Sequence, residues 1–270
     1  MAQLLQKIIR KLQDILFKLR HQASNKKIVH TKINGYELLV LANEDVGRQI
    51  CLRRFETAEA KYMYKMISSD AICIDIGANV GYFTLLMAQL ASSGSVHAFE
   101  PIPLNATLLK ASSQLNGFTN IHINQCAVGD TVGELPFSLS SDSAYSSIKD
   151  TGRKPLFDTF NVLVTTIDEY LALKCIDRVD IIKADVEGAE GLVISGASKL
   201  LSDKNRRPSM VLLELYDKNL QIFGESVNLV VTKMLNFKYK PFVINNDGNL
   251  LQYNDELKDS YYNILFIPFE

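Results

Sequence analysis

The chain has 270 residues, of which 47% are hydrophobic, and its formal net charge at pH 7 is −1. This length and apolar content are enough to bury a sizeable core, so we expect one main domain with modest additions. The near-neutral charge argues against the broad basic surface of a general nucleic-acid-binding protein, and we expect no nucleic acid partner.

Residues 1–27 are expected to form a basic amphipathic helix. Apolar residues recur at helical spacing from Leu4 to Leu19, and five Lys or Arg residues lie among them with a single acid, Asp14. The segment has no apolar run long enough for a membrane span or a signal-peptide core. We favour docking on the body of the domain or self-association through residues 1–22. Peripheral attachment to an anionic membrane and an organellar targeting role remain alternatives. The expected location is cytoplasmic, with or without membrane contact.

The next segment, residues 28–68, is expected to form a small cover over the main domain at residues 69–270. Residues 36–42 and 48–53 each fit a short strand, and the turn between them predicts a hairpin. A helix should follow over residues 56–68, before the first strand of the main domain.

An apolar run over residues 71–74 leads into the sequence DIGANVG, which comprises residues 75–81. A turn of small residues between a strand and a helix leaves backbone N–H groups free to face a ligand. Gly77 permits close ligand approach, Gly81 lets the next helix pack against the strand, and Asn79 tolerates a left-handed backbone. The segment therefore predicts a site for a nucleotide-type cofactor.

Carboxylates stand at the ends of the first two strands of the main domain. Glu100 follows the apolar residues 96–99, where such folds place an acid that accepts hydrogen bonds from a cofactor ribose. The alternative for Glu100 is a solvated carboxylate before the turn-forming Pro101 and Pro103. Asp75 suits the ammonium group of a ligand's amino-acid portion, and its alternative role is to cap the next helix.

A dehydrogenase that binds NAD shares this layout, but its fingerprint is G-x-G-x-x-G. Here an acid precedes Gly-x-Asn-x-Gly, which fits methyl transfer from S-adenosylmethionine better.

Two later predicted strands, which begin at Val179 and Met210, also end in acids. Asp185 and Glu187 follow the first of them, and Glu214 lies near the end of the second. Before them, residues 129–160 predict a β-excursion with a polar run, which suits a substrate loop near the active edge. If the strands are parallel, these acids share the carboxyl edge of one sheet, where ligands bind.

Asp185 and Glu187 are the leading candidates to orient an acceptor and to take its proton. Their alternative role is to cap the following helix. Lys183 lies on the same face of the strand as Asp185 and is expected to pair with it. Two neighbouring acids could also bind Mg²⁺, an alternative that we do not favour. The four cysteines and four histidines have no metal-ligand spacing, so we expect reduced thiols and no zinc.

The end of the chain is expected to close the sheet with an antiparallel pair of strands. Residues 240–244 and 261–267 fit the two strands, and residues 245–248 fit the turn between them.

Several motifs occur together in chain order: DIGANVGYFT from Asp75, AFEP from Ala98, AVGD from Ala127 and KADVEGAE from Lys183. In this combination the chain resembles the FkbM-type S-adenosylmethionine-dependent methyltransferases. The resemblance implies a class I methyltransferase fold, which is a Rossmann-like α/β fold with a mostly parallel seven-stranded sheet and helices on both faces. The N-terminal helix and the small β/α cover would be additions to it.

The resemblance further implies S-adenosylmethionine as cofactor, S-adenosylhomocysteine as product, and O-methylation of a small-molecule or glycan hydroxyl. The acceptor would be a sugar, a glycan or a secondary metabolite. An NAD-type oxidoreductase and a non-catalytic module that keeps the cofactor pocket remain alternatives. The predicted site has no metal ligand. The predicted catalytic residues are Asp185 and Glu187, and the predicted cofactor-binding residues are Asp75, Gly77, Ala78, Asn79, Gly81, Glu100 and Ala127.

Overall fold

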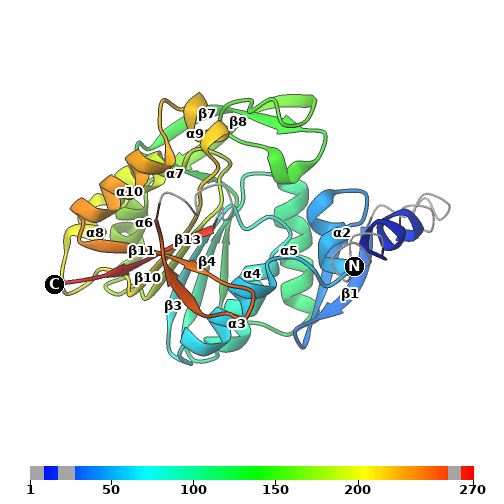
Figure 1. Cartoon of the computed structure of the whole chain (residues 1–270), viewed down its shortest axis with the longest axis horizontal. Coiled ribbons are helices and arrows are strands. Elements are labelled where there is room, and N and C mark those ends of the chain that lie inside the picture. The colour runs from blue at the N-terminus through cyan, green and yellow to red at the C-terminus, as the bar shows by residue number, and fades with distance from the viewer. Residues whose placement is uncertain (1–8, 18–27, 255–262) are drawn as a thin grey trace.

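The computed structural model describes residues 9–17, 28–254 and 263–270. Its centre is an eight-stranded sheet (Figure 1). The strands are β3 (Ile72–Ile76), β4 (Ser95–Phe99), β5 (Ile121–Asn124), β9 (Ile181–Ala184), β10 (Met210–Glu214), β11 (Tyr239–Ile244), β12 (Leu250–Gln252) and β13 (Asn263–Pro268). Their order across the sheet is β12-β11-β13-β10-β9-β3-β4-β5. Strands β5, β4, β3, β9 and β10 are parallel neighbours, whereas β13 is antiparallel to both β10 and β11.

Helices cover both faces of this sheet (Figure 1). One face carries α2 (Asp45–Cys51), α3 (Thr57–Met66), α4 (Tyr82–Leu90) and α5 (Pro103–Leu115). The other carries α6 (Ile167–Lys174), α7 (Glu190–Gly196), α8 (Ser198–Ser202), α9 (Asp217–Ile222) and α10 (Val227–Asn236). This is the predicted α/β arrangement of a class I methyltransferase, and the fold prediction is confirmed.

The alternation of side chains along the strands divides the core into two layers. Cys73 packs with the α2–α5 layer, whereas its neighbours Ile74 and Ile76 pack with the α6–α10 layer. In β10, Leu212 and Leu213 divide in the same way. Successive side chains of a strand point to opposite faces, so strands covered on both sides are apolar throughout. The sheet is therefore fixed from both faces, and its carboxyl edge is held rigidly.

The closing strands differ in detail from the prediction. The turn at residues 245–248 leads from β11 into the short edge strand β12, which adds an eighth strand to the predicted seven. β11 pairs with β13 on its other side. Of the predicted strand at residues 261–267, residues 261 and 262 lie outside the described part of the chain. A three-residue strand such as β12 has too little periodicity to be recognised from sequence.

The segment before the main sheet contains a hairpin, but not the predicted one. The paired strands are β1 (Ile28–Ile33) and β2 (Tyr36–Leu41), whereas the predicted second strand at residues 48–53 is mostly the helix α2. Asn34 and Gly35 have positive φ angles of 52° and 93°, and Asn-Gly is a strong signal for a two-residue hairpin turn. The prediction missed this local signal.

Between β5 and α6 the predicted β-excursion is present as a three-stranded sheet. It contains β6 (Ala127–Val128), β7 (Gly133–Ser140) and β8 (Leu156–Thr165), with the short 3₁₀ helix η1 (Ser143–Tyr145) in the loop between β7 and β8. In Figure 1 this sheet lies at the top of the view, near α9. We call residues 141–155 the roof loop.

Only part of the predicted N-terminal helix lies within the described residues. Residues 9–17 are helical, and residues 1–8 and 18–27 are outside the description. Asp14 pairs with Arg54 at 3.3 Å, but Ile9 and Leu16 on the apolar stripe are exposed. The interpretation that this stripe is buried against the body of the domain is therefore wrong for the described turns.

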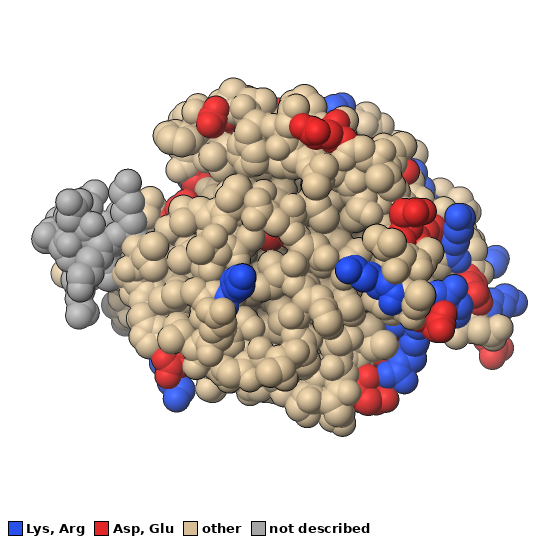
Figure 2. All heavy atoms as spheres, turned by 180° about the vertical axis from the view of Figure 1, so that it is seen from behind, with Lys and Arg blue, Asp and Glu red and all other residues tan. Residues whose placement is uncertain are grey.

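Among the helices of the described residues, none combines the length and the apolar character that crossing a membrane requires. Figure 2 shows the face behind the view of Figure 1, where Lys and Arg side chains lie among Asp and Glu.

Candidate active site

A cavity of about 340 Å³ opens at the carboxyl ends of β3, β4, β9 and β10. This volume lies within the range of roughly 300–1,000 Å³ typical of small-molecule sites. Every predicted site residue except Gly81 lines it. The lining members of the predicted set are Asp75, Gly77, Ala78, Asn79, Glu100, Ala127, Asp185 and Glu187.

The turn after β3 contacts the ends of both neighbouring strands, β4 and β9. The N–H groups of Gly77 and Ala78 both donate to the Phe99 carbonyl, at 2.9 and 3.0 Å. Gly77 has a φ of +75°, and a Cβ there would lie 1.8 Å from the carbonyl oxygen of Asp185. Only glycine fits this contact without moving the backbone of β9.

Gly81 lies outside the cavity lining, and its predicted role in cofactor binding stays a prediction. It caps α4 with a φ of 96°. A Cβ at this position would lie 2.3 Å from Leu109 and 2.9 Å from Leu85. Its role in the structure is to let α4 pack closely, which the sequence also predicted.

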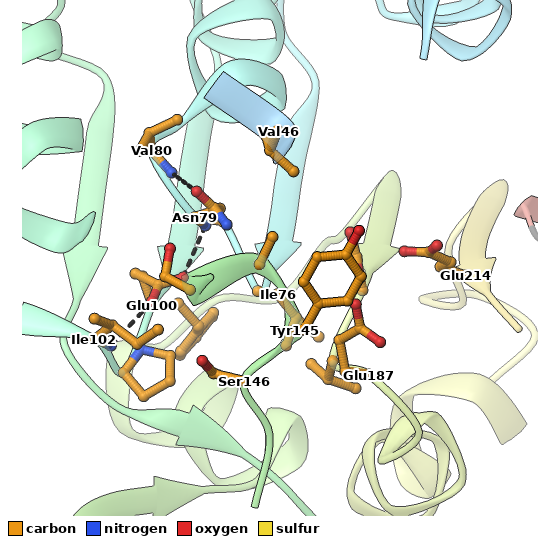
Figure 3. Close-up of a pocket in the computed structure, with 18 of the residues that line it drawn as sticks. Val46, Ile76, Asn79, Val80, Glu100, Ile102, Tyr145, Ser146, Glu187 and Glu214 are labelled. Carbon is orange, nitrogen blue, oxygen red and sulfur yellow. Dashed lines mark hydrogen bonds between the residues drawn. The ribbon is translucent and has the colours of Figure 1, made fainter. Parts of the chain in front are cut away.

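Glu100 is buried at the end of β4, with 4% of its surface exposed. Its carboxylate accepts hydrogen bonds from the N–H groups of Asn79 at 2.7 Å and Ile102 at 2.9 Å (Figure 3). Burial raises the pKa of Glu100 to about 7, although these two bonds act in the opposite direction. The alternative of a solvated carboxylate is therefore wrong, and Glu100 has the fixed position that a ribose ligand requires.

Asp75 is the most deeply placed carboxylate on the β3 side, with 1% of its surface exposed. Its Oδ2 accepts a hydrogen bond from Thr84 at 2.5 Å, and its Oδ1 is buried without a partner. Burial raises the pKa of Asp75, and the nearby Lys183 opposes this effect. Gly81 is the N-terminal cap residue of α4, and Asp75 is hydrogen bonded to the side chain and the backbone of Thr84 in the first turn of that helix. This agrees with the helix-capping alternative for Asp75, which does not exclude contact with a cofactor.

Acids gather at the other end of the cavity, as Figure 3 shows for Glu187 and Glu214. Lys183 pairs with Asp185 at 3.4 Å, as predicted. Burial alone would lower the pKa of Lys183, but Asp185 and other nearby carboxylates raise it above its usual value. The pKa of Glu214 is raised well above its usual value by burial and then by Asp185.

A further acid, Glu56, enters the cavity from the residue before α3 and was not predicted as a site residue. Burial raises its pKa to about 8. Glu56, Asp185 and Glu214 each offer a carboxylate oxygen, and these oxygens lie within 4.8 Å of one another. No local motif marks Glu56, because its place depends on how α3 packs against the sheet.

Glu187 is held more tightly than Asp185. It forms an ion pair with Arg153 at 2.6 Å and accepts a hydrogen bond from the side-chain amide of Asn219. Burial, and then Asp185, raise the pKa of Glu187 to about 7. The Arg153 guanidinium also lies 4.4 Å from the ring centroid of Tyr145. Glu187 is thus engaged by neighbours from two elements.

The N-terminal cap residue of α7 is Ala189, and no side-chain hydrogen bond caps this helix, so the structure does not show the helix-capping alternative for Asp185 and Glu187. Glu190 accepts hydrogen bonds from the N–H groups of Gly188 and Val186, both at 3.1 Å. Asp185 and Glu187 are accordingly left to face the cavity.

The roof loop covers the cavity and is attached to α2. Asp45 accepts hydrogen bonds from Tyr145 at 3.0 Å and from Lys154 at 2.9 Å, and its N–H donates to Asp142 at 2.8 Å. On the opposite side, Ser147 donates to the Val186 carbonyl at 2.8 Å. The sequence predicted a substrate loop here, but it missed the partner helix α2 because that segment was interpreted as a strand.

Comparison with known families gives one domain match over most of this region. The family model described as methyltransferase FkbM domain matches residues 75–241. Among curated proteins, "Methyltransferase sdnD" of Sordaria araneosa is 25% identical over 181 residues, covering 52% of this chain and 70% of that protein. The "31-O-demethyl-FK506 methyltransferase FkbM" of Streptomyces tacrolimicus is 25% identical over 185 residues, covering 51% and 68%. The "2-O-methyltransferase NoeI" of Sinorhizobium fredii is 24% identical over 147 residues, covering 49% and 60%.

Solved structures with a similar fold are more distant in sequence. An O-methyltransferase from Bacillus cereus in complex with SAH is 12% identical, with a TM-score of 0.43, and the match covers 94% of this chain and 89% of that one. A SAM-dependent methyltransferase from Agrobacterium tumefaciens is 9% identical, with a TM-score of 0.47, covering 89% and 69%.

Proposed function

Because the chain belongs to the methyltransferase FkbM domain family, we propose that it transfers the methyl group of S-adenosylmethionine to a hydroxyl oxygen of a small molecule or glycan. The observation that carries this proposal is the pair of buried carboxylates Asp75 and Glu100 at the ends of neighbouring parallel strands, in one cavity with Asp185. A cofactor that has both a ribose and an ammonium group matches these two acids.

The residues at the β3 and β4 end fit such a cofactor. Glu100 is oriented by Asn79 and Ile102 and keeps lone pairs for ribose hydroxyls. Asp75 has a buried oxygen without a partner, which suits an ammonium donor. Ala127 lines the same cavity beyond Glu100 and presents no charge. When bound, S-adenosylmethionine supplies an electrophilic methyl group on a sulfonium centre.

At the other end of the cavity, Asp185 is our proposed base. Its side chain keeps 21% of its surface exposed, and it faces the cavity beside Lys183. A carboxylate within reach of an acceptor hydroxyl can take the proton that the hydroxyl loses, and fixed orientation of the acceptor lowers the barrier further. Glu187, which is held by Arg153, orients the acceptor in this scheme.

Two of the relatives support oxygen as the methylated atom. Their printed names describe a 31-O-demethyl-FK506 methyltransferase and a 2-O-methyltransferase. The two names give different oxygen positions, 31-O and 2-O, so the oxygen acceptor is the shared chemistry, and the proposal for this chain stops at a hydroxyl group.

Calorimetric titration of the purified chain with S-adenosylmethionine, S-adenosylhomocysteine and NADH tests the cofactor. We expect both sulfur compounds to bind, NADH not to bind, and Glu100→Ala to weaken binding at least tenfold. Glu134→Ala, which changes an exposed acid on β7, is the matched control. Binding of NADH alone would contradict the proposal and favour the oxidoreductase.

Screening sugars and other hydroxyl compounds for turnover then tests the reaction. With a substrate in hand, Asp185→Asn should lower kcat at least ~10²-fold, the usual contribution of a general base, and leave the affinity for S-adenosylhomocysteine unchanged. Unchanged turnover in this variant would remove Asp185 as the base. Binding of cofactor without turnover of any acceptor would favour the non-catalytic module.

A further inference from the structure

Three carboxylates from distant parts of the chain meet at the Asp185 end of the cavity. Glu56 precedes α3, Asp185 follows β9 and Glu214 ends β10. Each offers one oxygen, and the three oxygens lie within 4.8 Å of one another. Oxygen ligands on opposite sides of Ca²⁺ are about 4.6–5.2 Å apart, and those around Mg²⁺ are about 4.2 Å apart. The spacing thus fits one shared cation with little side-chain movement.

Positive charge near this cluster is scarce. Lys183 forms its ion pair with Asp185, and Arg153 is paired with a carboxylate outside the cluster. Among the described residues, neither Glu56 nor Glu214 forms an ion pair with Lys or Arg. Neighbouring carboxylates in a buried site repel each other unless a proton or a cation lies between them. Lys183 is thus the positive neighbour of all three carboxylates, and its single charge leaves the cluster with an excess of negative charge when the three are ionised.

Two buried oxygens beside the cluster have no hydrogen-bond partner. One is Oε2 of Glu56, and the other is Oδ1 of Asn263, whose side chain is hydrogen bonded to Glu56. Asn263 lies opposite Glu214 where β13 pairs with β10. Buried polar atoms without partners are rare in native structures, and each one calls for an explanation. The Asn263 oxygen is an acceptor, and the Glu56 oxygen is an acceptor when the carboxyl is ionised, so a cation between them would satisfy both atoms.

We propose that Glu56, Asp185 and Glu214, together with the amide oxygen of Asn263, bind one divalent cation of the Mg²⁺, Mn²⁺ and Ca²⁺ class. The donor set consists of oxygens alone, which selects these hard ions over zinc and copper. Binding of the ion is independent of the proposed methyl transfer. Its use rests on that function: the ion holds and orients an acceptor hydroxyl beside the cofactor site.

Mn²⁺ binding measured by electron paramagnetic resonance tests the site without any turnover. The full chain is titrated with Mn²⁺ in the absence of cofactor, and the signal of free Mn²⁺ gives the number bound. We expect one ion per chain, displaced by excess Mg²⁺ or Ca²⁺. Glu56→Gln and Glu214→Gln should each weaken binding at least tenfold, because each removes a charged ligand. Glu134→Gln, on an exposed part of β7, should bind as the unchanged chain does.

Thermal unfolding of both variants establishes that they fold. No stoichiometric Mn²⁺ binding, or unchanged binding in both folded variants, would overturn the proposal. Saturation with S-adenosylhomocysteine should leave the Mn²⁺ bound; release of one ion per cofactor would assign the cluster to the cofactor's ammonium group and also overturn it. If S-adenosylhomocysteine binds and Mn²⁺ does not, the cation site is wrong while the proposed function stands.

Discussion

Three residues with strained backbones line the cavity. Glu56, Asn79 and Glu187 have φ angles of 36°, 50° and 54°, in the left-handed region that favours glycine. Such conformations cost of order 1–3 kcal/mol each and persist only where neighbours hold them. Here the neighbours are visible, since the N–H of Asn79 donates to Glu100 and the carboxylate of Glu187 is held by Arg153. The side chains of the site are therefore positioned before any ligand arrives.

The buried Glu100 predicts a pH dependence of cofactor binding. Its pKa is raised to about 7, chiefly by burial, so the carboxylate gains a proton as the pH falls through 7. Ribose hydroxyls donate more strongly to the ionised form, so binding favours loss of that proton. The affinity for S-adenosylhomocysteine should therefore rise with pH through 7 and level off above it, by up to roughly tenfold per pH unit.

Calorimetric Kd values at about pH 6, 7 and 8 measure this effect. Glu100→Gln removes the titrating group. At high pH this variant should bind S-adenosylhomocysteine more weakly than the unchanged chain does, and its Kd should vary less with pH. Other acids and the ligand's own amine titrate equally in both proteins, and the difference between the two profiles isolates Glu100. Parallel profiles would show that Glu100 does not control the pH dependence.

At the scale of elements, the roof loop depends on one carboxylate of α2. Burial alone would raise the pKa of Asp45, but hydrogen bonds from Lys154, Arg48 and Tyr145 lower it to about 2. The ionised Asp45 thus connects α2 to the loop at both Tyr145 and Lys154. Hydrogen bonds to a charged group contribute roughly 1.5–3 kcal/mol each, and partial exposure reduces this.

Asp45→Ala should therefore open the roof loop without unfolding the sheet. We expect amide hydrogen exchange in residues 141–155 to become at least about tenfold faster, which corresponds to roughly 1.4 kcal/mol, while β3 and β4 keep their protection. Mass spectrometry of exchanged peptides measures both regions. Asp70→Ala breaks an exposed ion pair with Arg178 before the start of β3, at the end of the strand opposite the cavity, and is the control. If amide exchange in residues 141–155 is equally fast in the two variants, Asp45 does not hold the roof loop in place.

The parts of the site that the sequence predicted are those with local patterns. The turn around Gly77 and the acids Asp75, Glu100 and Asp185 each follow an apolar strand, and parallel pairing brings such strand ends together. By contrast, Glu56 and Arg153 reach the cavity from segments outside the parallel sheet. Their positions depend on how a helix and a loop pack in three dimensions, and the hydrophobic periodicity of the sequence does not predict such packing.

The wrong strand at residues 48–53 has a different cause. The short pattern of apolar and basic residues in this segment fits either a strand or a helix. In the folded chain, burial of Ile50 on one side of the segment favours the helix. Close packing of Gly47 also favours the helix, since a Cβ there would lie 2.1 Å from the Leu41 carbonyl. In contrast, Asn34-Gly35 was a local signal of the true hairpin.

At the scale of the whole molecule, charge is distributed unevenly between the N-terminal segment and the rest of the sequence. Residues 1–22 contain five Lys or Arg residues and one acid, although the whole chain has a net charge of −1. The described turns, residues 9–17, lie at one end of the molecule beside α2 and β1 (Figure 1). Asp14 and Gln13 contact Arg54 of the body, and Leu12 and Leu16 are exposed by 53% and 64%.

A basic helix with an uncovered apolar face suits an anionic membrane surface. Each Lys or Arg near such a surface contributes about 1 kcal/mol, and apolar side chains add to this when they enter the interface. We therefore expect the chain to sediment with vesicles that contain phosphatidylserine, and much less with neutral phosphatidylcholine vesicles. Deletion of residues 1–22, or Leu12→Ser with Leu16→Ser, should lower sedimentation at least tenfold and leave the affinity for S-adenosylhomocysteine unchanged. If deletion leaves sedimentation unchanged but converts a dimer to a monomer in ultracentrifugation, the apolar face serves self-association instead.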